Sequence, residues 1–133
     1  MKLAQRELEL KVLKIMVTHD NATFIAGEKA LKDYHFLTKE PGVDQSITAQ
    51  IFKLCDSYAK SSGGYKLTET VLESMLTKKG LSAQLQGKFL NLWYDIVDTE
   101  VEYDEFPYLI VWMKERYCKN LIAKMFEDNT SKI

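Results

Sequence analysis

The chain has 133 residues, 46% of them hydrophobic, which is enough for the core of one domain and leaves little room for a second. Its 18 basic and 19 acidic residues give a formal net charge of -1, which excludes a general attraction to nucleic acid or anionic membranes. The longest wholly apolar run, Leu109 to Met113, is too short to span a bilayer, and the N-terminus lacks the apolar run of a signal peptide. We therefore expect a cytoplasmic chain that does not enter membranes.

Apolar residues recur at helical spacing along nearly the whole chain. No segment keeps the period-two alternation of a strand, so the sequence predicts an all-α fold. A first helix is expected from about Ala4 to Thr18. Asp20 or Asn21 can cap a second helix, which is expected to end near residues 34–36.

Turn residues separate the next two predicted helices. A loop is expected over residues 37–43, after which Asp44 would cap a third helix that stops at the Ser-Ser-Gly-Gly of residues 61–64. Thr68 is the expected N-cap of a short fourth helix that ends at Gly80. These four helices form a predicted helical head, residues 1–80.

Two long helices follow, from about Ser82 to Thr99 and from about Phe106 to Asp128. Their short connection predicts a long antiparallel helical hairpin over residues 81–130. A broad apolar arc of the last helix is expected to pack against its neighbour in this hairpin. The residues of the arc are Ile110, Val111, Tyr117, Cys118, Leu121, Ile122 and Met125.

The two long helices carry further apolar residues outside their mutual contact. On the first of them a second apolar line contains Leu90, Trp93 and Val97, and on the second Leu109 and Trp112 fall on the predicted solvent side. Either the N-terminal end of the last helix tucks under the first four helices or it makes an intermolecular contact. The sequence leaves both alternatives open.

Sequence patterns of catalysis are missing. There is no GxxxxGK[ST] phosphate-binding loop, so ATP hydrolysis is not expected. His19 and His35 have no carboxylate or cysteine at metal-site spacing, and Cys55 and Cys118 lie on apolar helical stripes as predicted packed thiols. The chain is therefore predicted to be no enzyme and to hold no catalytic, cofactor-binding or metal-binding residues.

Six acidic residues lie between positions 95 and 105 without a basic residue among them. The segment lacks the central glycine of a calcium-binding EF-hand loop, so solvation of a turn or docking of a basic partner is the better interpretation. The possible acidic docking patch comprises Asp98, Glu100, Glu102, Asp104 and Glu105. Lysines are scattered instead of forming a groove with aromatic residues, so direct DNA binding is expected to be weak or absent.

Several short segments follow a known family pattern. They are Glu9–Leu13 leading into Met16–Asn21, the acidic-aromatic turn Asp33–Phe36, the helix Gln50–Leu54 with Tyr58, the set Gly63-Gly64, Leu67, Val71-Leu72 and Leu76, and the basic segment Trp112–Tyr117. In content and order they resemble the N-terminal domain of DnaB-family replicative helicases, particularly the phage versions, over about residues 6–127. The loop from Leu37 to Val43 is longer than is usual in that family.

The resemblance implies a non-catalytic collar domain in a longer helicase, in which ATP and Mg²⁺ bind only a C-terminal ATPase domain. Such domains pair with other helicase subunits, support ring assembly, and offer a surface to primase and sometimes to a helicase loader. The resemblance and the excess of apolar surface together predict a self-association surface of five residues: Leu90, Trp93, Val97, Leu109 and Trp112. The alternative is a small stand-alone helical adaptor or loader-like replication protein of a phage or bacterium.

Overall fold

The computed structural model describes residues 3–18, 21–39 and 46–131 of the chain, without the side chains of residues 21 and 128–131. In chain order its elements are α1 (Gln5–Thr18), α2 (Asn21–Ala30), the 3-10 helix η1 (Asp33–His35), α3 (Ile47–Ser62), α4 (Glu69–Lys78), α5 (Ala83–Asp98), the 3-10 helix η2 (Tyr103–Glu105) and α6 (Phe106–Ser131). No strand occurs within these ranges, so the all-α prediction is confirmed. Within the same ranges, no helix has both the length and the apolar character needed to cross a membrane.

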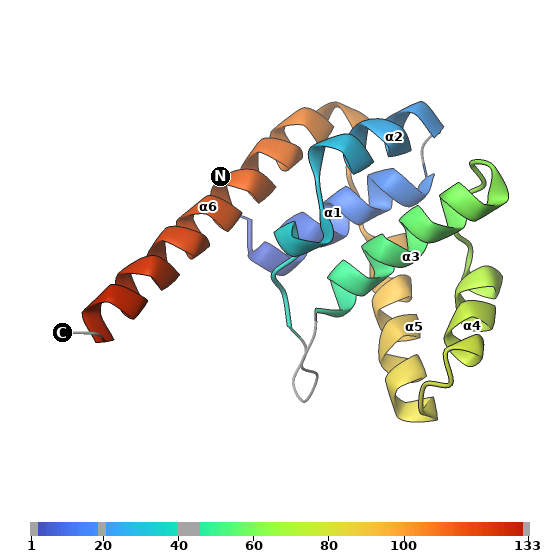
Figure 1. Cartoon of the computed structure of the whole chain (residues 1–133). Coiled ribbons are helices and arrows are strands. Elements are labelled where there is room, and N and C mark those ends of the chain that lie inside the picture. Colours follow the sequence, from blue (N-terminus) through green and yellow to red (C-terminus); the bar gives the residue numbers. More distant parts are fainter. Residues whose placement is uncertain (1–2, 19–20, 40–45, 132–133) are drawn as a thin grey trace.

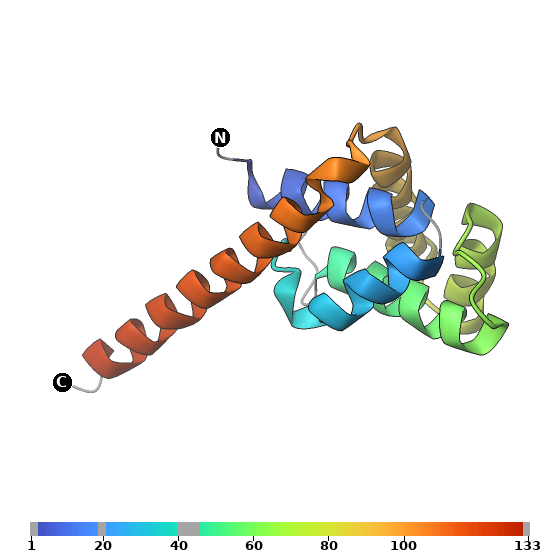
Figure 2. The same cartoon turned by 90° about the horizontal axis from the view of Figure 1, so that it is seen from above.

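Helix α1 is the centre of the packing. Helices α2, α3, α5 and α6 all contact it, as the two views of the molecule show (Figures 1 and 2). This arrangement buries α1 on several sides, and Leu8, Val12, Leu13 and Ile15 are fully enclosed. Because so many neighbours meet on one helix, the hydrophobic core is continuous from α3 to the start of α6.

Side-chain caps define where three of the helices begin. Ser46, Thr68 and Ser82 each accept a hydrogen bond from the backbone N–H three residues further on, at the starts of α3, α4 and α5. The prediction of Thr68 as an N-cap is confirmed. The predicted cap Asp44 lies outside the described residues, and Ser46 caps α3 in the structure.

Glycine ends α3 and follows the end of α4. Gly63 and Gly80 have φ angles of 78° and 71°, in the left-handed region that glycine adopts without steric penalty. A Cβ atom at either position would meet nothing within 4 Å, so only the backbone conformation restricts these positions to glycine.

Helix α2 ends earlier than the sequence predicts. It stops at Ala30, and the segment expected to continue it forms the separate 3-10 helix η1. At this point the side chain of His35 accepts a hydrogen bond from the backbone N–H of Lys32, at 2.9 Å. A local bond from side chain to backbone offers that N–H a partner outside the α-helical pattern, and this explains the break.

Helices α5 and α6 diverge from their connection and do not run along one another as the expected hairpin requires (Figures 1 and 2). Helix α5 packs on α1, α3 and α4, whereas α6 packs on α1, η1 and η2. The physical reason lies in the buried side chains of α6. Phe106, Leu109 and Met113 are enclosed in the head, which draws the first turns of α6 onto α1 instead of α5. The packing therefore does not divide the chain at residue 80.

Candidate interaction surface

The five residues predicted to form a self-association surface do not share one exposed face. Trp93 and Leu109 are only 5% and 1% exposed and belong to the core of a single copy. Leu90 and Trp112 are half-buried against that core, and Val97 alone is exposed. Trp93 and Leu109 are thus unavailable to a second copy of the folded chain, and Leu109 follows the alternative in which this end tucks into the head.

The apolar arc of α6 that was expected to pack on α5 is instead largely open to solvent. Val111, Leu121, Ile122 and Met125 are about half exposed, at 51%, 47%, 54% and 58%. Helix α6 has 26 residues, which corresponds to about 39 Å, and its C-terminal half projects from the other helices in both views (Figures 1 and 2). Periodicity shows that these residues share one side of the helix, but it does not show whether another element covers that side.

Four of these residues form a line along the helix. Val111, Cys118, Ile122 and Met125 are separated by seven, four and three positions, which places them within about 60° of one another around an α-helix. The same spacing occurs in the core positions of a coiled coil. We call these four exposed residues the outer row of α6.

Charged side chains border the outer row. Lys114, Glu115 and Lys119 line an open groove on α6 together with Val111 and Cys118. All five residues come from one helix, so the groove is a feature of its exposed face and not a cavity. An apolar line between charged flanks is the pattern of a helix that binds another helix.

The first half of α6 is anchored to the head. The Arg116 guanidinium donates hydrogen bonds to the backbone carbonyl of Leu3 and to Oε1 of Gln5. One residue further on, the ring of Tyr117 lies 5.0 Å from the rings of both Tyr34 and His35. Residues 118–127 are all exposed, so the head fixes α6 as far as Tyr117 and leaves the outer part uncovered.

The predicted acidic patch lies on the connection from α5 to α6. Glu105 is half-buried, and its Oε1 lies 3.5 Å from Nζ of Lys11. A second cation of α1, Arg6, pairs with Asp95 at 2.5 Å. The other members of the patch are exposed: Asp98, Glu100, Glu102 and Asp104. Helix α1 thus neutralises the two ends of the acidic segment, while its middle faces solvent.

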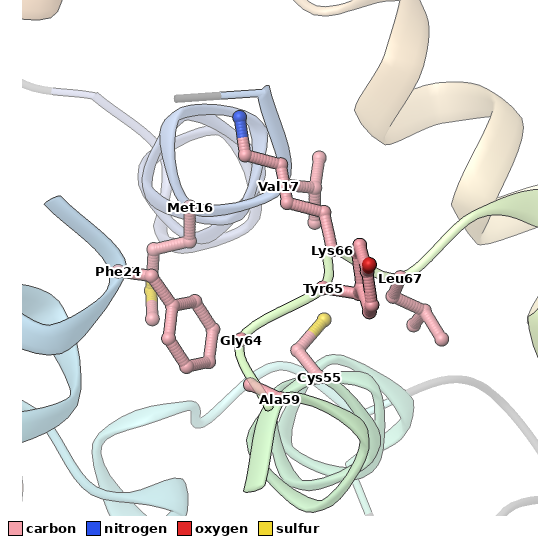
Figure 3. A pocket seen from close by; sticks show the side chains of 9 residues that line it. All are labelled: Met16, Val17, Phe24, Cys55, Ala59, Gly64, Tyr65, Lys66 and Leu67. Atoms are coloured by element: carbon pink, nitrogen blue, oxygen red, sulfur yellow. The ribbon is translucent and has the colours of Figure 1, made fainter. Parts of the chain in front are cut away.

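A small pocket lies between the end of α1, helix α2 and the connection from α3 to α4 (Figure 3). The volume of this pocket, about 10 Å³, is no more than one water molecule requires, so the pocket is not a ligand site. Lys66 reaches past Val17 in Figure 3, and its Nζ donates to the carbonyl of Thr18 at 3.0 Å. The pocket is therefore a packing defect, lined in part by Lys66.

The two cysteines differ in their surroundings. Cys55 lines this pocket, and burial raises the pKa of its thiol to about 12, so the thiol stays protonated and unreactive. Cys118 is exposed on α6. The prediction of a packed thiol is confirmed for Cys55 and is wrong for Cys118.

Among the described residues, no group of three or more His, Cys, Asp or Glu side chains is placed to hold a metal ion. His35 is buried among aromatic rings, and His19 lies outside the described residues.

Comparison of the chain with family models, curated proteins and solved structures found no match. The most distinctive surface of the described chain is thus the outer row of α6.

Proposed function

We propose that the chain is a non-catalytic assembly module, and that it serves as the N-terminal collar domain of a replicative DNA helicase. The observation that supports assembly is the outer row of α6, an exposed apolar line on a helix that projects from the head. The helicase role is supported by the sequence resemblance over about residues 6–127. ATP and Mg²⁺ would bind only the ATPase domain of the parent protein.

The outer row gives self-association a physical driving force. Burying an apolar side chain of this size completely stabilises a contact by about 1.5–3 kcal/mol. In a two-fold dimer the same surface is used by both copies, so each apolar residue of the row is buried in both of them. The projecting helix also lets a second copy approach without steric conflict with the head. Other helicase subunits are the proposed partners of this surface.

Further partners would use a different surface. The exposed acids on the connection between α5 and α6 suit a basic region of primase or of a helicase loader. Such a contact would weaken as salt screens the charges, whereas pairing through the apolar outer row would not. The two surfaces can therefore be distinguished by the salt dependence of binding.

The test of assembly is sedimentation equilibrium over a concentration series. We expect reversible self-association of the wild-type chain, and a loss of at least about tenfold in pairing affinity for Ile122→Asp, because a carboxylate would be buried in the apolar contact. Ile25→Asp is the matched control, since Ile25 is 40% exposed on α2 and is not part of the outer row. A wild-type chain that stays monomeric, or equal effects of both variants, would contradict the proposal. A stand-alone adaptor that binds only a different protein would give the monomeric result.

A further inference from the structure

His35 connects the head to α6 through an aromatic contact in which the imidazole ring is buried. Its side chain is 8% exposed, and its ring lies 4.5 Å from Tyr34 of the same 3-10 helix and 5.0 Å from Tyr117 of α6. The ring of Tyr117 meets it edge to face. Beyond Tyr117 the side chains of α6 up to residue 127 are exposed, so this contact marks the place where α6 leaves the head.

The hydrogen bonding of His35 fixes its protonation state. Its Nδ1 accepts the backbone N–H of Lys32 at 2.9 Å, which requires a lone pair on that nitrogen. The neutral ring has this lone pair when its proton is on Nε2. An imidazolium carries N–H on both nitrogens, so protonation removes the acceptor and sets two N–H groups against each other.

We propose that His35 is a pH-sensitive clasp, which holds α6 on the head while its imidazole is neutral and lets the outer half of the helix move when it is protonated. The effect on assembly rests on the proposed function, because the outer row lies mostly in that half of α6. The clasp itself rests only on the contacts of His35.

The charged groups around the clasp act in both directions. Lys32, next to η1, and Lys114, on α6, disfavour a positive charge on the ring, whereas Asp33 favours it. Asp33 is also engaged with Lys53 of α3, whose Nζ lies 3.2 Å from its Oδ2. Two further titratable side chains, the phenols of Tyr34 and Tyr117, lie in ring contact with His35.

The sign of the pH effect follows from burial. Burial lowers the pKa of His35 below its ordinary value of 6.5, and Lys114 acts in the same direction. The closed clasp is therefore fully stable above pH 6.5, where the ring is neutral whether the clasp is open or closed. Its stability is lost as the pH falls from 6.5 through the lower pKa of the closed state, since the open state then binds more protons.

The test uses the exposed thiol of Cys118 on α6. A pH-insensitive fluorophore attached there reports motion of the helix, and the buried, protonated Cys55 does not compete for the label. Time-resolved anisotropy is recorded on the monomeric chain from about pH 8 to about pH 5. We expect the amplitude of local motion to rise about twofold in the wild-type chain at the lower pH.

Two variants separate His35 from other titrating groups. In His35→Asn the amide oxygen can replace Nδ1 as the acceptor but cannot titrate, so the motion should be independent of pH. His19→Asn removes the other histidine and should behave as the wild type. A pH-independent wild-type chain, or a His35→Asn chain that still titrates, would overturn the clasp.

A second measurement needs no variant. The His35 ring is titrated by NMR in the wild-type chain, and its midpoint must lie below 6.5 and coincide with the midpoint of the anisotropy change. Different midpoints would overturn the clasp. If the clasp titrates as expected but the chain never pairs at any pH, the clasp stands and the proposed function fails.

Discussion

At the scale of single residues, Glu9 is a buried polar group that joins three segments of the chain. It is completely buried, yet Oε2 accepts hydrogen bonds from Gln5 Nε2 at 2.6 Å and from the backbone N–H groups of Leu37 and Thr38 at 2.8 and 3.0 Å. The hydroxyl of Thr48 donates to Oε1. One carboxylate thus joins α1 to the segment after η1 and to the first turn of α3, through four donated hydrogen bonds.

Replacing Glu9 by Gln should lower the free energy of unfolding by about 1–3 kcal/mol, because charge-assisted hydrogen bonds become neutral and the amide NH₂ adds donors where acceptors are needed. Glu7→Gln is the matched control, since Glu7 is exposed on the same helix. Urea denaturation of both variants measures the difference. Equal stabilities of the two variants would show that the buried network contributes nothing net.

At the scale of elements, the helix ends that depend on local interactions were predicted correctly from the sequence. The cap at Thr68 and the glycine after α4 depend on residues within one turn, and both are where the sequence places them. The expected cap at residue 44 shows the limit of such predictions, because Ser46, two positions later, is an equally good cap and caps α3 in the structure. The break after Ala30 was missed because it depends on one side-chain bond of His35.

The neighbours of α5 and α6 could not be predicted from periodicity. An apolar arc shows that a helix face can be buried, but the sequence does not show against what. Both long helices pack on α1. As a result Leu109 is enclosed and Leu121 is exposed, although both are leucines on apolar lines of one helix. The five residues expected to pair therefore include none of the outer row, because periodicity does not distinguish an apolar line that the head covers from one that stays exposed.

This pair of leucines provides a test of the arrangement. Leu109→Ala should lower the free energy of unfolding by about 2–5 kcal/mol, because it leaves a cavity in the core. Leu121→Ala should change it by no more than about 0.5 kcal/mol, since that side chain is exposed. Thermal unfolding at a concentration where the chain is monomeric compares the two. If α5 and α6 formed the hairpin that the sequence suggested, the order of the two effects would be reversed.

At the scale of the whole molecule, α1, α2 and α6 meet at one crowded point. A Cβ atom on Gly27 of α2 would lie 3.1 Å from Cζ of Phe106 and 3.2 Å from Cε of Met16. Phe106 is the first residue of α6, so this close approach sets where α6 starts across the head. The start of α6 is thus packed closely against a glycine about 80 positions earlier in the chain.

Gly27 can be compared with Gly87, which lies inside α5 and whose added Cβ would meet nothing within 4 Å. Gly87→Ala should raise the free energy of unfolding by about 0.5–1 kcal/mol, because alanine loses less backbone entropy in a helix. Gly27→Ala has the same helical advantage, but Phe106 and Met16 must both shift by a few tenths of an ångström to admit the methyl group. We therefore expect Gly27→Ala to be less stable than Gly87→Ala in urea denaturation, and Gly27→Val to fall below the wild type by about 1–3 kcal/mol. Equal stabilisation by alanine at both positions would mean that α2 and α6 are not held in close contact at Gly27, and the anchoring of α6 would then rest on its other contacts with the head, at Leu109, Met113, Arg116 and Tyr117.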